Sequence, residues 1–203
     1  MTNGRLRRDR QGAVDYLKNR TSLKEVIRPE GCREPVRLPG DQEHECHICT
    51  EEVPEDSFVV LGEPLIQKEK RRKCDCIILY ERDDGREPFI AIVLAEIRSQ
   101  LPRPKRKDIR GRSKFDQKFK HTSEEVRRIL RGLKRRMNGE VEVRWFPVLI
   151  TLPLTEKQID ILKGKTVACG LKNKRLLHKA CDPRKDLHPH LLRDIIDFGP
   201  EAI

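Results

Sequence analysis

Two acidic residues, Asp75 and Glu96, stand on either side of a predicted hairpin turn and could act together. The turn is the segment RDDGRE, whose central Asp-Gly is typical of tight hairpins. If the turn is centred between Gly85 and Arg86, Asp75 lies directly opposite Glu96, with Cβ atoms about 5 Å apart. Two adjacent carboxylates repel each other unless a positive charge lies between them. Mg²⁺ or Mn²⁺ would supply that charge through oxygen ligands, and such an ion keeps water molecules that can attack a phosphodiester.

Two basic residues flank this predicted carboxylate pair. Arg98 follows Glu96 by two positions and therefore shares its face of the strand, and Lys73 is the residue opposite Arg98. A cation at either position could orient the attacking water or stabilise the charge that develops on phosphorus. The alternative is an ordinary cross-strand network of surface charges, which is common in heat-adapted proteins. The scarcity of Asn and Gln beside abundant Arg, Lys and Glu is a weak signature of such a source.

The elements that must position these residues form an α/β fold with a sheet of mixed direction. Strands are predicted at 57–62, 73–81, 87–99 and 140–151, and a long helix at 113–137. The segment PFIAIVL reads as a strand that is buried on both faces. We divide the chain into a basic N-terminal helix with an irregular Cys/His-rich segment (1–54), a core (55–152) and a helical C-terminal extension packed on the core (153–203). Within these end regions we expect a helix at 5–28, irregular chain at 29–56, a Thr-capped helix at 155–164, a strand at 165–171 and a terminal helix at 187–198.

The order of these elements and charges resembles the PD-(D/E)xK nuclease superfamily, over roughly residues 55–152. Asp75 matches the motif's Asp, and AEIRS supplies its Glu as Glu96. The resemblance implies a restriction-endonuclease-like core that hydrolyses DNA phosphodiester bonds with Mg²⁺ or Mn²⁺ held by Asp75 and Glu96. Arg98 departs from the pattern, because it stands where the family has Lys, and an arginine stays protonated and cannot act as a base.

The departure at Arg98 leaves three interpretations open. Arg98 could stabilise phosphate charge while a lysine acts from elsewhere, namely from Lys73 or from Lys114 or Lys118 on the following helix. Alternatively, the site is degenerate and the fold binds nucleic acid without cutting it. The family often adds an acidic residue from an N-terminal helix, for which the candidates are Glu25, Glu30 and Glu51.

A basic segment follows the candidate site directly and favours a nucleic-acid partner. The formal net charge of +11 attracts polyanions, and the predicted phosphate contacts gather in one stretch. These contacts are Arg103, Lys105, Arg106, Lys107, Arg110, Arg112, Lys114 and Lys118. DNA is the expected partner and RNA stays open, whereas an aromatic content of 4% argues against a binder that stacks on single-stranded bases. The alternative is that this basic segment is an ordinary solvated loop.

Seven cysteines are many for an intracellular chain, and their spacing suggests a structural role. Cys46-x-x-Cys49 is a tight zinc chelate, and we expect Cys74 and Cys76 to point together to the sheet face opposite Asp75. These four cysteines could hold a structural Zn²⁺, although disulfides and plain buried thiols remain alternatives. His178, His188 and His190 form no metal motif and are expected to be surface or core histidines.

The remaining sequence features narrow the class of protein. No apolar run approaches the roughly 18 residues of a membrane span, and the N-terminus lacks a signal-peptide core. We therefore expect a cytoplasmic protein without a membrane partner. No phosphate-binding Gly-rich loop occurs, which disfavours a kinase or a nucleotide-driven motor. Nucleases of the resembled type often form homodimers, and a zinc-stapled module that binds an acidic protein remains a third class.

Overall fold

The structure is a computed structural model, and it describes residues 14, 17–19, 27, 31–37, 43–61, 73–82, 89–101, 114–136, 142–181 and 190–197. Most of the predicted helix at 5–28 lies outside this part of the chain. Within it, Val14 and Leu17–Asn19 are helical, with Val14 and Leu17 buried, and Ile27 forms a β-bridge with Leu61.

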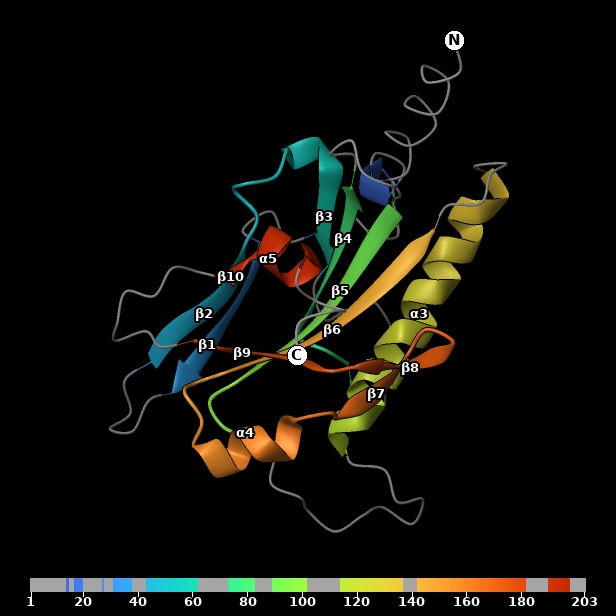
Figure 1. The fold of residues 1–203 in the computed structure, drawn as a ribbon. Helices are drawn as coiled ribbons and strands as arrows, with labels where there is room; N and C mark the ends of the chain where they lie inside the picture. The colour runs from blue at the N-terminus through green and yellow to red at the C-terminus, as the bar shows by residue number, and fades with distance from the viewer. Residues whose placement is uncertain are drawn as a thin grey trace.

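A five-stranded mixed sheet forms the centre of the molecule (Figure 1). Its strand order is β3 (Phe58–Leu61), β4 (Cys76–Arg82), β5 (Phe89–Arg98), β6 (Val143–Thr151) and β9 (Leu177–Ala180). Strand β4 runs antiparallel to both β3 and β5, and β5, β6 and β9 run parallel. Every residue of β4 is buried, as is all of β5 except Arg98, which explains the continuous apolar run in the sequence.

Helix α3 (Lys114–Arg136) covers one face of this sheet. Phe115 and Phe119 meet edge to face with ring centroids 5.1 Å apart, and they pack with Ile77 and Leu79 of β4 and Leu94 of β5. The predicted helix at 113–137 is therefore confirmed, and its apolar stripe is the face that contacts the sheet.

A small second sheet covers the opposite face. It contains β1 (Cys32–Arg37), β2 (Glu43–Cys49) and β10 (His190–Leu191), and α5 (Leu192–Asp197) follows it. Its core side chains join those of alternate residues in β4 and β5, so the central sheet is buried on both faces. This second cluster includes Val36, Ile48, Ile78, Val93, Leu192 and Ile195.

The predicted irregular segment at 29–56 is wrong, because most of it forms the antiparallel hairpin β1–β2 and a 3₁₀ turn, η1 (Glu55–Ser57). Cys46 and Ile48 are buried while Glu45 is exposed and His47 is half-buried, which is the alternation of a strand with one solvent face. The alternation was not recognised in the sequence, because the Cys and His residues were interpreted as metal ligands.

The predicted helical extension at 153–203 is also wrong in part. It begins with the expected helix α4 (Glu156–Leu162), where the Thr155 N–H donates to Oε1 of Gln158 at 2.9 Å in a capping box. A hairpin of β7 (Thr166–Cys169) and β8 (Lys172–Arg175) then packs on α3, and β9 joins the central sheet. The division at residue 152 therefore falls within the fold that the central sheet organises.

Candidate active site

The hairpin β4–β5 has the register that the turn predicted. Cys76 pairs with Ala95 and Tyr80 with Ala91, and Asp75 and Glu96 are the next residues along the two chain segments. Asp75 is held there by a hydrogen bond from the Ile97 N–H to its Oδ2 at 2.7 Å. This bond fixes the carboxylate at the end of β5, on the face of the sheet that α3 covers.

Lys118 of α3 reaches both carboxylates. Its Nζ lies 2.7 and 2.8 Å from the two oxygens of Glu96 and 3.4 Å from Oδ1 of Asp75. Glu96 is fully buried, and Lys118 and Asp75 are about a fifth exposed. Three elements thus bring two carboxylates and one ammonium group together at the start of β4, the end of β5 and the first turns of α3.

A second contact holds α3 in this position. The Cys74 N–H donates to Oγ1 of Thr122 at 2.9 Å, one helical turn beyond Lys118. Phe119 is fully buried beside Lys118 and anchors the same turn of the helix in the core. The lysine is therefore directed at the carboxylates by a helix that is fixed on either side of it.

Arg98 lies at the outer edge of this cluster. Its Nε donates to Oε1 of Glu96, and its side chain is 34% exposed. Arg98 also faces Thr151 of β6 in the parallel register. The guanidinium group therefore contacts a buried carboxylate on one side and is accessible to solvent, which suits an electrostatic contact with an anionic ligand.

The electrostatics of the cluster follow from burial and from the close charges. Burial and the neighbouring Asp75 raise the pKa of Glu96, and they outweigh the opposing effects of Lys118 and Arg98. Burial alone would lower the pKa of Lys118, but Asp75 and Glu96 more than compensate and raise it above its ordinary value. Lys118 is therefore an ammonium group at neutral pH, and Glu96 depends on it for compensation.

From the sequence, Lys118 is predicted to be a DNA contact and is also, with Lys73 and Lys114, a candidate for the family's lysine. The structure places its Nζ against the buried Glu96. Lys73, which lies two residues before Asp75, is buried. A signal for Lys118 exists in the sequence, because it shares the apolar stripe of α3 with Phe115, Phe119 and Thr122 at helical spacing.

The four-cysteine zinc site is not formed. Cys46 is in a disulfide with Cys181, and Cys76 is in a disulfide with Cys32. Cys74 and Cys76 also lie on opposite faces of the sheet, because regular pairing in β4 begins only at Cys76. Cys49, Cys74 and Cys169 are free thiols, and burial raises the pKa of Cys169 to about 12.

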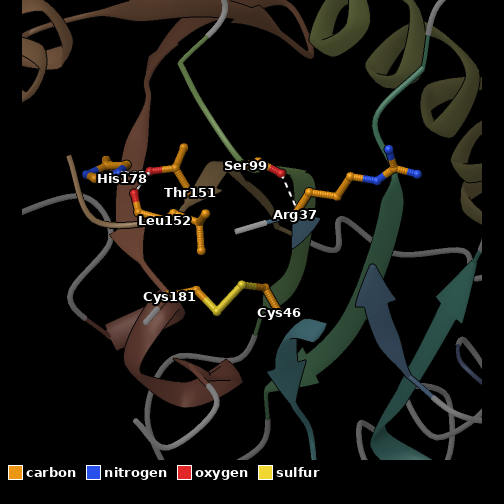
Figure 2. Close-up of a disulfide and its surroundings, with 7 residues drawn as sticks. All are labelled: Arg37, Cys46, Ser99, Thr151, Leu152, His178 and Cys181. Carbon is orange, nitrogen blue, oxygen red and sulfur yellow. Dashed lines mark hydrogen bonds between the residues drawn. A yellow bond between two sulfur atoms is a disulfide. The ribbon is translucent and has the colours of Figure 1, made fainter. Parts of the chain in front are cut away.

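The rim of the site next to Arg98 is tied to the second sheet (Figure 2). The Arg37 N–H at the end of β1 donates to Oγ of Ser99 at 2.8 Å. On β6, the Thr151 hydroxyl donates to the Leu152 carbonyl at 2.7 Å and lies 2.9 Å from Nε2 of His178. Sequence reasoning missed this Thr151–His178 contact, because the pairing of β9 with β6 was not predicted.

Other candidate residues are not brought to the site. Glu51 follows β2 and interacts with His47 in the small sheet, on the far side of the central sheet. The positions of Glu25 and Glu30 lie outside the described residues, as do Arg103, Lys105, Arg106, Lys107, Arg110, Arg112 and the side chain of Lys114. Within the described ranges, no group of three or more His, Cys, Asp or Glu side chains could hold a metal ion. Asp75 and Glu96 are thus a pair of potential ligands.

Comparison with known proteins gives no further guide to the site. No protein family model, no curated protein and no solved structure matches this chain. In the part of the chain that the structure describes, no helix has the length and apolar character needed to cross a lipid bilayer.

Proposed function

We propose that this protein is a metal-dependent nuclease that hydrolyses DNA phosphodiester bonds on a restriction-endonuclease-like core. The observation that carries the proposal is the convergence of Asp75, Glu96 and Lys118 from β4, β5 and α3. These are the three residue types of the PD-(D/E)xK motif, with the lysine supplied by the helix in place of Arg98.

The order of elements around the site supports the same family. An antiparallel meander of β3, β4 and β5 is followed by α3 and then by β6, which pairs parallel with β5. This is the order in which the motif is carried in the resembled superfamily. The α/β class with a mixed sheet is a property of this structure, and membership of that superfamily is part of the proposal.

The residues at the site fit a hard divalent cation. Asp75 and Glu96 offer carboxylate oxygens, and both already lie within 3.4 Å of one positive charge, the ammonium nitrogen of Lys118. Mg²⁺ or Mn²⁺ held by these two side chains would offset their mutual repulsion, promote ionisation of a water molecule and stabilise charge on the phosphate.

The chain's own residues would position the reaction. Hydrolysis forms a bond between the water oxygen and phosphorus and breaks an ester P–O bond, and a proton passes to the departing alkoxide. Lys118 carries a proton at neutral pH and is placed to donate hydrogen bonds to the attacking water or to a phosphate oxygen. Arg98, at the accessible edge, would stabilise the charge that develops on the phosphate.

One observation favours a second candidate, a protein that binds nucleic acid without cutting it. Lys118 bonds both oxygens of Glu96 and Arg98 bonds one of them, so the two carboxylates are already neutralised by two cations. A site that is satisfied in this way has less need of a metal ion than an uncompensated pair of carboxylates.

A cleavage assay separates the two candidates. Labelled single- and double-stranded DNA is incubated with the wild-type protein in Mg²⁺, Mn²⁺ or EDTA, beside Asp75→Asn and Glu96→Gln. We expect cleavage only with metal, and at least a 100-fold loss in each variant with DNA binding in EDTA retained. Tight binding by wild-type protein without cleavage in either metal would reject the nuclease and leave the binding protein.

A further inference from the structure

We infer that the β7–β8 hairpin, residues 166–175, is a contact surface for duplex DNA beside the candidate site. The inference rests on the proposed function for the identity of the polymer, and it concerns residues that the basic segment 103–114 does not include. Its basis is the charge, exposure and anchoring of this hairpin.

The hairpin belongs to the longest acid-free stretch of the described C-terminal region. Between Asp160 and Asp182 the chain has six cations and no acidic residue. These cations are Lys163, Lys165, Lys172, Lys174, Arg175 and Lys179. A segment whose charged residues are all positive attracts polyanions.

The buried side of the hairpin fixes it to the molecule. Val167 and Cys169 of β7 are buried in the core cluster that includes α3, and the Leu176 N–H donates to the Lys165 carbonyl at 2.8 Å at the base. At the tip, Gly170 has φ +70°, and a Cβ placed there would lie 2.8 Å from Nε1 of Trp145. The hairpin is thus a positioned ribbon, and little conformational freedom would be lost on binding.

The exposed end of the hairpin has the character of a nucleic-acid contact. Leu171 at the tip is 82% exposed, Lys172 and Asn173 beside it are exposed, and Lys174 is half-buried. Lysines contact phosphates without reading sequence, and an apolar tip beside them can enter a groove of the duplex. A two-stranded ribbon also has the width that the major groove admits.

The base of the hairpin lies beside α3, the helix that carries Lys118 (Figure 1). Nζ of Lys165 lies 3.5 Å from Oδ1 of Asp116 and 4.9 Å from the ring centroid of Phe115. Both partners belong to the first turn of α3, directly before Lys118. A duplex whose phosphate reached Lys118 and Arg98 would therefore pass close to the hairpin.

The test measures DNA binding in EDTA, so that cleavage does not contribute. A fluorescein-labelled 20-base-pair duplex is titrated with protein over a salt series, using the wild type and Lys172→Ala/Lys174→Ala. We expect the double variant to bind about tenfold more weakly, with the slope of log Kd against log salt reduced by about 2. The matched control, Arg33→Ala/Arg193→Ala, removes two cations from the small sheet and the start of α5 and should bind within about twofold of wild type.

Two further arms make the inference falsifiable. Leu171→Ala should weaken duplex binding several-fold without changing the salt slope, and unchanged affinity would contradict the placement of the tip in a groove. Equal effects of the hairpin and control variants, or stronger wild-type binding to single strands, duplex RNA or an acidic polypeptide, would overturn the inference. Thermal melts verify that each variant folds. If the wild-type protein cleaves DNA but the hairpin variants bind DNA as tightly as wild type, only the hairpin surface is rejected. If DNA binding depends on the hairpin but no cleavage occurs, only the nuclease is rejected.

Discussion

A fully buried carboxylate is unstable in a protein unless other groups compensate its charge, and Glu96 obtains that compensation from Lys118 and Arg98. The pair with Lys118 is the inner one, since only 18% of the lysine side chain is exposed. Replacing such a pair with apolar residues is often harmless, whereas removing one partner leaves an uncompensated charge.

Substitution Lys118→Met should destabilise the protein in a pH-dependent manner. Without Lys118 the pKa of Glu96, already raised by burial and Asp75, rises further because a stabilising cation is lost. At pH 8 the folded state must then hold a buried carboxylate that only Arg98 compensates, at a cost of about 2–4 kcal/mol, whereas at pH 5 protonation of Glu96 removes much of that cost. Urea unfolding at the two pH values measures the difference.

A double variant provides the control for this experiment. Lys118→Met combined with Glu96→Gln removes the buried carboxylate at position 96, so its stability relative to wild type should vary much less between pH 5 and pH 8. An equal loss of stability at both pH values in the single variant would show that Glu96 does not depend on Lys118.

At the residue scale, the sequence predicted the register that brings Asp75 beside Glu96, but it did not select Lys118 from the three candidate lysines. Hairpin register follows from the position of the turn, and the observed pairing of Cys76 with Ala95 is the predicted one. Lys118 required knowledge of how α3 lies on the sheet, which local periodicity does not provide. The pairing of cysteines could not be predicted either, because many connectivities are compatible with seven cysteines.

Among the elements, the β7–β8 hairpin depends on a glycine at its turn. Gly170 has φ +70°, which side-chain-bearing residues rarely adopt, and a Cβ added there would also lie 2.8 Å from Nε1 of Trp145. Gly164 has nearly the same φ, +69°, but an added Cβ would meet no atom within 4 Å. A comparison of the two glycines therefore distinguishes the effect of a positive φ from the effect of contact with Trp145.

Substitution Gly170→Ala should destabilise the protein by about 2–4 kcal/mol, because it combines backbone strain with a clash against Trp145. Gly164→Ala should cost only about 1 kcal/mol, from the backbone alone. Chemical denaturation of both variants measures the comparison. Equal losses would mean that the Trp145 ring moves aside freely and that the hairpin tip is not held in place.

The success of prediction at the element scale followed the strength of the periodic signal. The strands from β3 to β6 and helix α3 were predicted, because apolar runs and a helical stripe marked them. Strand β9, with the sequence LHKA, has one apolar residue beyond Ala and pairs only at the edge of the sheet. This strand forms because it pairs with β6, and its own sequence has no pattern that predicts a strand.

For the molecule as a whole, two disulfides connect the small sheet to the central one. Cys32 of β1 is bonded to Cys76 of β4, and Cys46 of β2 is bonded to Cys181 after β9. Their sequence separations of 44 and 135 residues are long, so each bond greatly restricts the unfolded chain. The first also fixes β4 directly beside Asp75.

These disulfides predict a definite thiol count and a loss of stability on reduction. Unfolded but unreduced protein should titrate three thiols, whereas a zinc site with no disulfide would release seven cysteines. In the native protein Cys49 should react first, because Cys74 and Cys169 are buried and burial raises the pKa of both.

Reduction of the disulfides should lower the stability of the protein by about 2–5 kcal/mol per bond, as measured by thermal melting with and without reductant. Seven titratable thiols, or melting that reductant does not change, would contradict the disulfides.

The measurement that tests the central claim most directly is single-turnover DNA cleavage by wild-type protein and by Lys118→Met, with binding measured in EDTA on the same preparations. Lys120→Met is the matched control, since Lys120 lies two residues away on α3, is 40% exposed and pairs with Glu124. The account predicts metal-dependent cleavage by wild type and the control, and a loss of at least about 100-fold in Lys118→Met with binding retained within a few-fold. Equal cleavage by Lys118→Met and the control, or no cleavage by wild type, would contradict it.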